Sequence, residues 1–159
     1  MDASFSADEH FRRGQAALAE GDHAAALEHF RAAHRLDPTS PRHRSYFGLC
    51  LGLAERRFDK ALELCRSAAK EEFFNPALYH NLARIHLAFG FKAEAIRHLR
   101  RGLMIDPGNE AIAENLRRLG IRRHPVLAFF RRRHPINRWL GRLRTRGGTG
   151  ESAMEPFQV

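Results

Sequence analysis

The chain has 159 residues, of which 43% are hydrophobic and 28% are charged. This length and composition are typical of one globular domain, and the abundance of Ala, Leu, Arg and Glu favours helices. No apolar run approaches the roughly 18 residues of a membrane-spanning helix. The N-terminus has no basic head followed by an apolar block, so we expect no secretory signal and a cytoplasmic protein.

The net charge of +9 is unevenly distributed along the chain. Residues 1–116 are balanced, with 16 Lys and Arg against 16 Asp and Glu. Residues 117–159 hold 11 Arg and two Glu, so they account for the whole excess. Such asymmetry within one chain is a better clue to function than the overall charge.

In chain order, residues 1–6 form a short polar end that we expect to be disordered. A helical pattern starts at Ala7 and breaks at Gly21-Asp22, and a second helix stops at Leu36-Asp37-Pro38. The same hairpin follows from Pro41 and again from Pro76, where the last copy ends at Asp106-Pro107. Residues 7–40, 41–75 and 76–109 are therefore predicted to be three copies of one helix-turn-helix unit.

Small residues give the period of these copies. Gly14, Gly48 and Ala83 are separated by 34 and 35 residues, and Ala26, Ala61 and Ala95 by 35 and 34. We assign the one extra residue of the second copy to its turn, around residues 54–57. The second copy also has Phe73 where the others have proline, so its second helix is expected to continue through residues 71–72.

A 34-residue period of helix, turn and helix resembles the tetratricopeptide repeat family. The resemblance covers about residues 7–109 and implies an all-α, right-handed α-solenoid. In proteins of this family, Gly or Ala at these positions lets the two helices of each repeat approach closely. The matching residues are Gly14, Ala17, Gly21, Ala26, Phe30, Ala33 and Pro38, then Phe47, Gly48, Leu51, Ala61, Cys65 and Ala68, then Tyr79, Leu82, Ala83, Gly90, Ala95, Leu99, Gly102 and Pro107.

The sequence beyond the repeats divides into three segments. Residues 110–120 have apolar Ala111, Ile112, Leu116 and Leu119 on one face, as a helix that caps a solenoid requires. Residues 121–144 form a basic amphipathic extension with Arg-His-Pro twice. Residues 145–159 are Gly-rich and polar, and we expect them to be disordered.

No catalytic or metal-binding motif is present in the sequence. The ten histidines have neither His-Glu-x-x-His nor zinc spacing, and there is no Gly-x-Ser-x-Gly or phosphate-binding loop. Cys50 and Cys65 are interpreted as buried small hydrophobes in a reducing compartment. We therefore expect no enzyme, no cofactor and no metal.

The resemblance implies that the first helix of each repeat lines a concave groove for an extended peptide or a helix. The stripe opposite the packing residues offers arginine forks that suit an acidic or carboxylate-bearing peptide. A solvated face without a dedicated ligand is the alternative. Some family members clamp acidic chaperone tails with Lys and Asn. That activity is not carried over, because Phe11, Gln15 and Ala77 stand on the stripe and only Asn81 and Arg84 are suggestive of such a clamp. The predicted groove residues are Phe11, Gln15, Leu18, Arg42, Ser45, Leu49, His80, Arg84 and Leu87.

The basic extension allows three interpretations. It extends the solenoid core, binds an anionic membrane surface or nucleic acid, or binds an acidic protein. Its candidate residues are Arg122, Arg123, Arg131, Arg132, Arg133, Arg138, Trp139 and Arg142. We expect a protein-binding adaptor or scaffold. The alternative is a peripheral membrane or nucleic-acid binder, and the sequence names neither the partner nor the oligomeric state.

Overall fold

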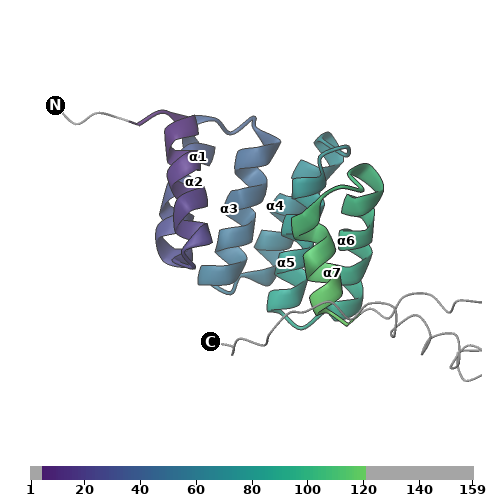
Figure 1. Ribbon diagram of the computed structural model, residues 1–159. Helices are drawn as coiled ribbons and strands as arrows, with labels where there is room; N and C mark the ends of the chain where they lie inside the picture. The colour runs from purple at the N-terminus through teal and green to yellow at the C-terminus, as the bar shows by residue number, and fades with distance from the viewer. Residues whose placement is uncertain (1–4, 121–159) are drawn as a thin grey trace, which may run out of the picture. The chain divides into compact units, whose positions relative to one another are not determined.

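A computed structural model describes residues 5–120, which contain seven α-helices and no strand (Figure 1). The helices form three antiparallel pairs and a final single helix, a right-handed α-solenoid as predicted. Their bounds are α1 (Ala7–Ala19), α2 (His23–Leu36), α3 (Pro41–Ala54), α4 (Phe58–Glu71), α5 (Pro76–Ala88), α6 (Lys92–Ile105) and α7 (Glu110–Arg118). No helix in this part of the chain is long and apolar enough to cross a bilayer.

Side-chain caps explain where most of these helices begin. Five of the seven helices start after a residue whose side chain accepts a hydrogen bond from a free N–H group of the first turn. Each such cap contributes about 1 kcal/mol to the stability of its helix. The prolines at the start of α3 and α5 lose no helical hydrogen bond there. The capping residues are Ser6, Asp22, Ser40, Asn75 and Asn109.

The turns within the three pairs all have three residues, which corrects one prediction. The extra residue of the second pair lengthens its first helix instead: α3 has 14 residues, whereas α1 and α5 have 13. The second turn also differs in its central residue. Gly21 and Gly90 hold a positive φ in the other pairs, whereas Arg56 holds a φ of 58°. Its guanidinium donates to the carbonyl of Ala88 at 3.0 Å.

The hydrophobic core consists of three clusters, and each joins one pair to the next helix. One cluster lies between α1, α2 and α3, another between α3, α4 and α5, and the third between α5, α6 and α7. Each pair therefore buries its apolar face only with its neighbour's help, as repeat proteins require. Cys50 and Cys65 are free and buried in this core, as predicted, and burial raises the pKa of each thiol to about 12.

Two glycines let the paired helices approach closely. A Cβ on Gly14 would lie 2.8 Å from the Phe30 ring. A Cβ on Gly48 would lie 2.9 Å from the Cβ of Leu64 and 3.0 Å from the carbonyl oxygen of Ala61. These distances are shorter than van der Waals contact, so both positions require the smallest residue.

The single helix α7 covers the end of the third pair. Ile112 is fully buried, and Leu116 and Leu119 pack around the same cluster. Ala111 was expected on the buried face but is exposed, because the helix rests on Ile112 instead. The predicted basic extension (121–144) and Gly-rich tail (145–159) lie outside the described residues, and so do their candidate arginines and Trp139.

Candidate functional site

The predicted groove residues lie on the first helices of the three pairs, α1, α3 and α5, and we call this stripe the A-helix face. Helix α3 packs against both α2 and α5, which brings its residues next to those of α5. The nine residues of the face differ widely in exposure, so they cannot all meet a ligand.

Three of the nine residues are buried, which corrects their predicted role. Phe11 is 2% exposed, and Ser45 and Leu49 are fully buried. The Phe11 ring packs edge-on against Phe30 and Tyr46, with centroids 5.3 and 5.0 Å apart. Leu49 belongs to the cluster between α3, α4 and α5. These side chains pack between the helices and lie beneath the accessible residues of the face.

Ser45 joins the second pair to the third through buried hydrogen bonds. Asn81 on α5 donates from its side-chain amide to the Ser45 hydroxyl at 3.1 Å. The thiol of Cys65 on α4 donates to the Ser45 carbonyl at 3.0 Å. Since unpaired polar groups are costly inside a protein, this network fixes how α3, α4 and α5 meet.

Arg42 is an exposed cation on this face and lies over Phe11. Its guanidinium carbon is 4.1 Å from the centroid of the Phe11 ring. A cation at this distance is attracted by the π-electrons of the ring, which limits the positions of the side chain. Arg42 therefore presents its donors from a defined place beside α1.

Arg84 is a half-buried cation without an acidic partner in the described part of the chain. None of the ion pairs formed within residues 5–120 includes it. Burial lowers the pKa of Arg84, and the nearby Cys50 and Tyr46 of α3 oppose that shift. An arginine side chain stays protonated in proteins, so Arg84 carries a partly desolvated positive charge.

His80 is neutral and contacts helix α7. The side-chain nitrogen of Asn115 donates to the Ala111 carbonyl at 2.8 Å and lies 2.9 Å from Nε2 of His80. Because an amide nitrogen only donates, Nε2 must accept, and the proton of the neutral ring is on Nδ1. Burial, followed by the charge of Arg84, lowers the pKa of His80 to about 4.

The remaining predicted residues are half-buried. Leu18 packs against the first two core clusters, and Leu87 packs against the third. Gln15 is also partly accessible. The accessible part of the face therefore combines two arginines, the Nδ1 donor of His80, an amide and two leucines.

Sequence reasoning took Asn81 as suggestive of a groove residue, whereas it is buried, and gave Asn115 no role in the site. A usable signal existed for Asn115, since it follows His80 by 35 residues, the period of the repeats. Asn81 follows Ser45 by 36 residues and contacts it from the next pair. Both contacts join a residue of one repeat to a residue about one period later. The spacing of residues along a single helix does not reveal such contacts.

No group of three or more His, Cys, Asp or Glu side chains within residues 5–120 is arranged to hold a metal ion. The buried thiols have raised pKa values, whereas a nucleophilic thiol needs a lowered one.

Comparison with known proteins identifies one family. Models described as Tetratricopeptide repeat match residues 7–40 and residues 52–119. Among solved structures, an Arabidopsis OM64 TPR domain matches with a TM-score of 0.56 and 18% identity, over 71% of this chain and 93% of that chain. The first TPR of Spaghetti (RPAP3) bound to the HSP90 peptide SRMEEVD matches with a TM-score of 0.58 and 18% identity, over 72% and 93%. The second TPR domain of human RPAP3 in complex with the HSP70 peptide SGPTIEEVD matches with 0.55 and 17%, over 73% and 96%.

Proposed function

Because the chain belongs to the tetratricopeptide repeat family, we propose that it is a non-catalytic adaptor that binds a segment of another protein on its A-helix face. Two of the similar structures hold chaperone peptides that end in Glu-Glu-Val-Asp. Their shared fold supports a protein partner for this chain, and its own residues define the chemistry of that partner.

The observation that carries the proposal is the half-buried charge of Arg84. A partly desolvated arginine without a carboxylate partner in residues 5–120 gains free energy when a ligand supplies one. A planar guanidinium binds a carboxylate through two parallel hydrogen bonds, and Arg42 offers a second such fork. The favoured ligand is therefore an acidic segment or a free C-terminal carboxylate.

The other residues of the face orient this ligand. His80 offers its Nδ1–H as a neutral donor, which suits a backbone carbonyl or a carboxylate oxygen. Leu18 and Leu87 offer apolar contact. Phe11 and Leu49 act beneath the surface, where Phe11 holds Arg42 in place.

The test asks whether a partner protein still binds when the positive charges of the A-helix face are replaced by negative ones. Proteins captured by the full chain are identified, purified and titrated against wild type and the double variant Arg42→Glu with Arg84→Glu. We expect binding to weaken by at least about tenfold while the helical circular dichroism signal persists. Arg35→Glu is the control, since Arg35 is exposed and lies on α2, the second helix of its pair. Unchanged affinity of the double variant would contradict the proposal.

A second candidate function rests on the charge of the C-terminal quarter. Residues 117–159 hold 11 Arg and two Glu, and they include the aromatic Phe129, Phe130 and Trp139. This composition suits an anionic membrane surface or nucleic acid. The test compares the full chain with a variant ending at Gly120, using anionic vesicles and RNA. Binding that is lost on truncation and weakens steeply with salt supports this candidate, and salt-insensitive binding argues against it.

A further inference from the structure

Exposed aromatic and apolar side chains and several exposed arginines occur around the third helix pair. Phe73 and Phe74 follow α4 and are 49% and 75% exposed, and Met104 in the last turn of α6 is 74% exposed. Apolar side chains of this size are seldom left exposed in a group unless they bind something. We call the group the Phe-Arg surface, and it consists of Phe73, Phe74, Tyr79, Arg97, Arg100, Arg101 and Met104.

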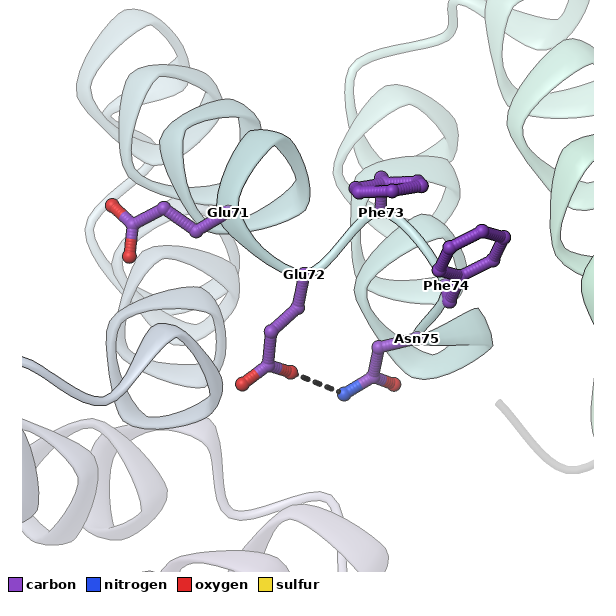
Figure 2. Close-up of a pocket in the computed structure, with 5 residues that line it drawn as sticks. All are labelled: Glu71, Glu72, Phe73, Phe74 and Asn75. Atoms are coloured by element: carbon purple, nitrogen blue, oxygen red, sulfur yellow. Dashed lines mark hydrogen bonds between the residues drawn. The ribbon is translucent and has the colours of Figure 1, made fainter.

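The two phenylalanines are held outward by an ordered loop. Figure 2 shows both rings projecting from the loop between α4 and α5, beside Glu71, Glu72 and Asn75. The Asn75 amide donates to the Glu72 carboxylate at 2.8 Å, and the Asn75 backbone N–H donates to the Glu72 carbonyl at 3.1 Å. These bonds fix the loop, so the exposure of the rings is a property of the folded chain. A hollow of about 310 Å³ lies among these residues.

The outer side of α6 supplies the charge. A second hollow, of about 360 Å³, is lined there by Ala93, Ile96, Arg97, Arg100, Arg101 and Met104. None of the three arginines takes part in an ion pair formed within residues 5–120. Glu94 is the one acidic residue of α6, against Lys92 and the three arginines. The helix therefore presents uncompensated positive charge around an apolar centre.

Tyr79 contacts one lining residue of each hollow. Its hydroxyl donates to the carbonyl of Phe73 at 3.3 Å, and the guanidinium carbon of Arg101 lies 5.9 Å from the centroid of its ring. An aromatic end and a basic end thus meet through one side chain. A ligand that extends across both ends would contact the rings at one end and the arginines at the other.

From this geometry we infer that the Phe-Arg surface docks a second protein segment, one that carries carboxylates beside an exposed apolar side chain. The arginines bind the carboxylates, and Met104 and the phenylalanines contact the apolar side chain. This surface lies outside the A-helix face, so the adaptor would hold two protein segments at separate places.

The carboxylate of Glu72 favours a protein segment over an anionic membrane. Glu71 and Glu72 line the hollow beside the phenylalanines, and Glu71 is paired with Arg44 at 2.6 Å, whereas Glu72 is in none of the ion pairs formed within residues 5–120. A membrane presents negative charge across its whole surface and would meet repulsion at Glu72. A peptide can instead place its acidic side chains at the arginine end and its apolar side chain near Phe74.

The test begins with a random peptide library displayed on phage and selected on the full chain. Selected peptides are synthesised with a fluorescent label and titrated by anisotropy against wild type, Phe74→Ser and the double variant Arg100→Glu with Arg101→Glu. We expect a class of peptides with acidic residues next to Leu, Met or Phe, whose affinity falls by about tenfold or more in both variants. Because all three positions are exposed, circular dichroism should show unchanged helix content.

Controls separate this surface from the A-helix face. Binding of that peptide class should be unchanged in Arg84→Glu, whereas loss in Arg84→Glu alone would assign the peptides to the A-helix face and overturn the inference. Selection of no acidic and apolar class would also overturn it. In a parallel experiment the full chain is sedimented with phosphatidylserine-containing vesicles, and we expect Phe74→Ser to leave sedimentation unchanged. Loss of vesicle binding in Phe74→Ser would identify a membrane surface and likewise overturn the inference.

Discussion

The imidazole rings of His86 on α5 and His98 on α6 are stacked, with centroids 5.2 Å apart and planes 16° from parallel. Phe58 and Phe91 meet the His86 ring edge-on, at centroid distances of 5.8 and 6.1 Å. Neither ring nitrogen of His86 has a hydrogen-bond partner in the described part of the chain. The histidine pair thus acts as an aromatic contact between the helices of the third repeat, and this contact requires neutral rings.

Acid is therefore expected to weaken the fold through this pair. Burial, then the charges of His86, Arg66 and Arg97, lower the pKa of His98 to about 4, and burial also lowers the pKa of His86. The unfolded chain binds these protons near pH 6.5, so the contribution is complete above that pH and is lost as pH falls toward 4. Allowing for solvent screening, we expect the free energy of unfolding to drop by on the order of 1–2 kcal/mol over this range.

Urea unfolding of wild type and His98→Phe across this pH range measures the effect. The variant keeps an aromatic ring in the stack but cannot be protonated, so its stability should depend less on pH than that of wild type. Carboxylates with lowered pKa values, such as those of Asp37 and Glu114, also titrate in acid, but they contribute equally to both proteins. An identical pH dependence in the two proteins would contradict the assignment.

The repeat architecture was predictable because its local signals are strong and recur. Pro41 and Pro76 begin helices, and Gly48 stands where a Cβ would meet Leu64. Each of these signals involves residues of one helix or one helix pair, so it can be recognised in a single sequence. The extra residue of the second repeat was misplaced, because Arg56 takes the positive φ that glycine marks in the other two turns.

The sequence predicted which residues share the candidate A-helix face, but not how deeply each of them is buried. A helical stripe shows which residues share a side, and it identified Arg42, His80 and Arg84 as polar members of the accessible face. How deeply each residue is buried depends on the next pair. Ser45 is covered where Asn81 reaches it from α5, and Phe11 is covered by Tyr46 and by Arg42 itself. Such contacts between repeats depend on tertiary packing.

Close approach of α3 and α4 at Gly48 gives the next prediction. In Gly48→Ala the new methyl group would lie 2.9 Å from the Leu64 Cβ and 3.0 Å from the Ala61 carbonyl oxygen, and neither atom is the end of a flexible chain. Overpacking of this kind typically costs 1–3 kcal/mol, and the better helix propensity of alanine offsets about 1 kcal/mol. We expect a net loss of up to about 2 kcal/mol, measured by chemical denaturation.

Gly108→Ala is the matched control for this substitution. A Cβ there would meet only the Asp106 carboxylate, at 3.6 Å, which is ordinary contact. We expect its stability to stay within about 0.5 kcal/mol of wild type. If both variants are equally stable, the helices of the second pair do not need glycine for their close approach.

The contact between Asn115 and His80 gives a prediction for the binding face itself. Asn115→Asp replaces the donor that faces Nε2 of His80 with a carboxylate, which favours the protonated imidazole. We expect the pKa of His80 to rise from about 4 by 1–3 units, because an opposite charge at hydrogen-bond distance produces shifts of this size. The Ala111 carbonyl loses its side-chain donor in the same variant, so hydrogen exchange in α7 should become faster.

An NMR titration of the histidine ring protons measures the shift, and the His80 signal is assigned by its absence in His80→Gln. The new carboxylate also lies near Arg84, whose charge already lowers the pKa of His80. It should therefore compete with an acidic ligand and weaken binding on the A-helix face by several-fold, while peptides bound to the Phe-Arg surface keep their affinity. A His80 pKa that stays near 4 in Asn115→Asp would show that Nε2 does not accept from Asn115, and the neutral tautomer assigned to the face would be wrong.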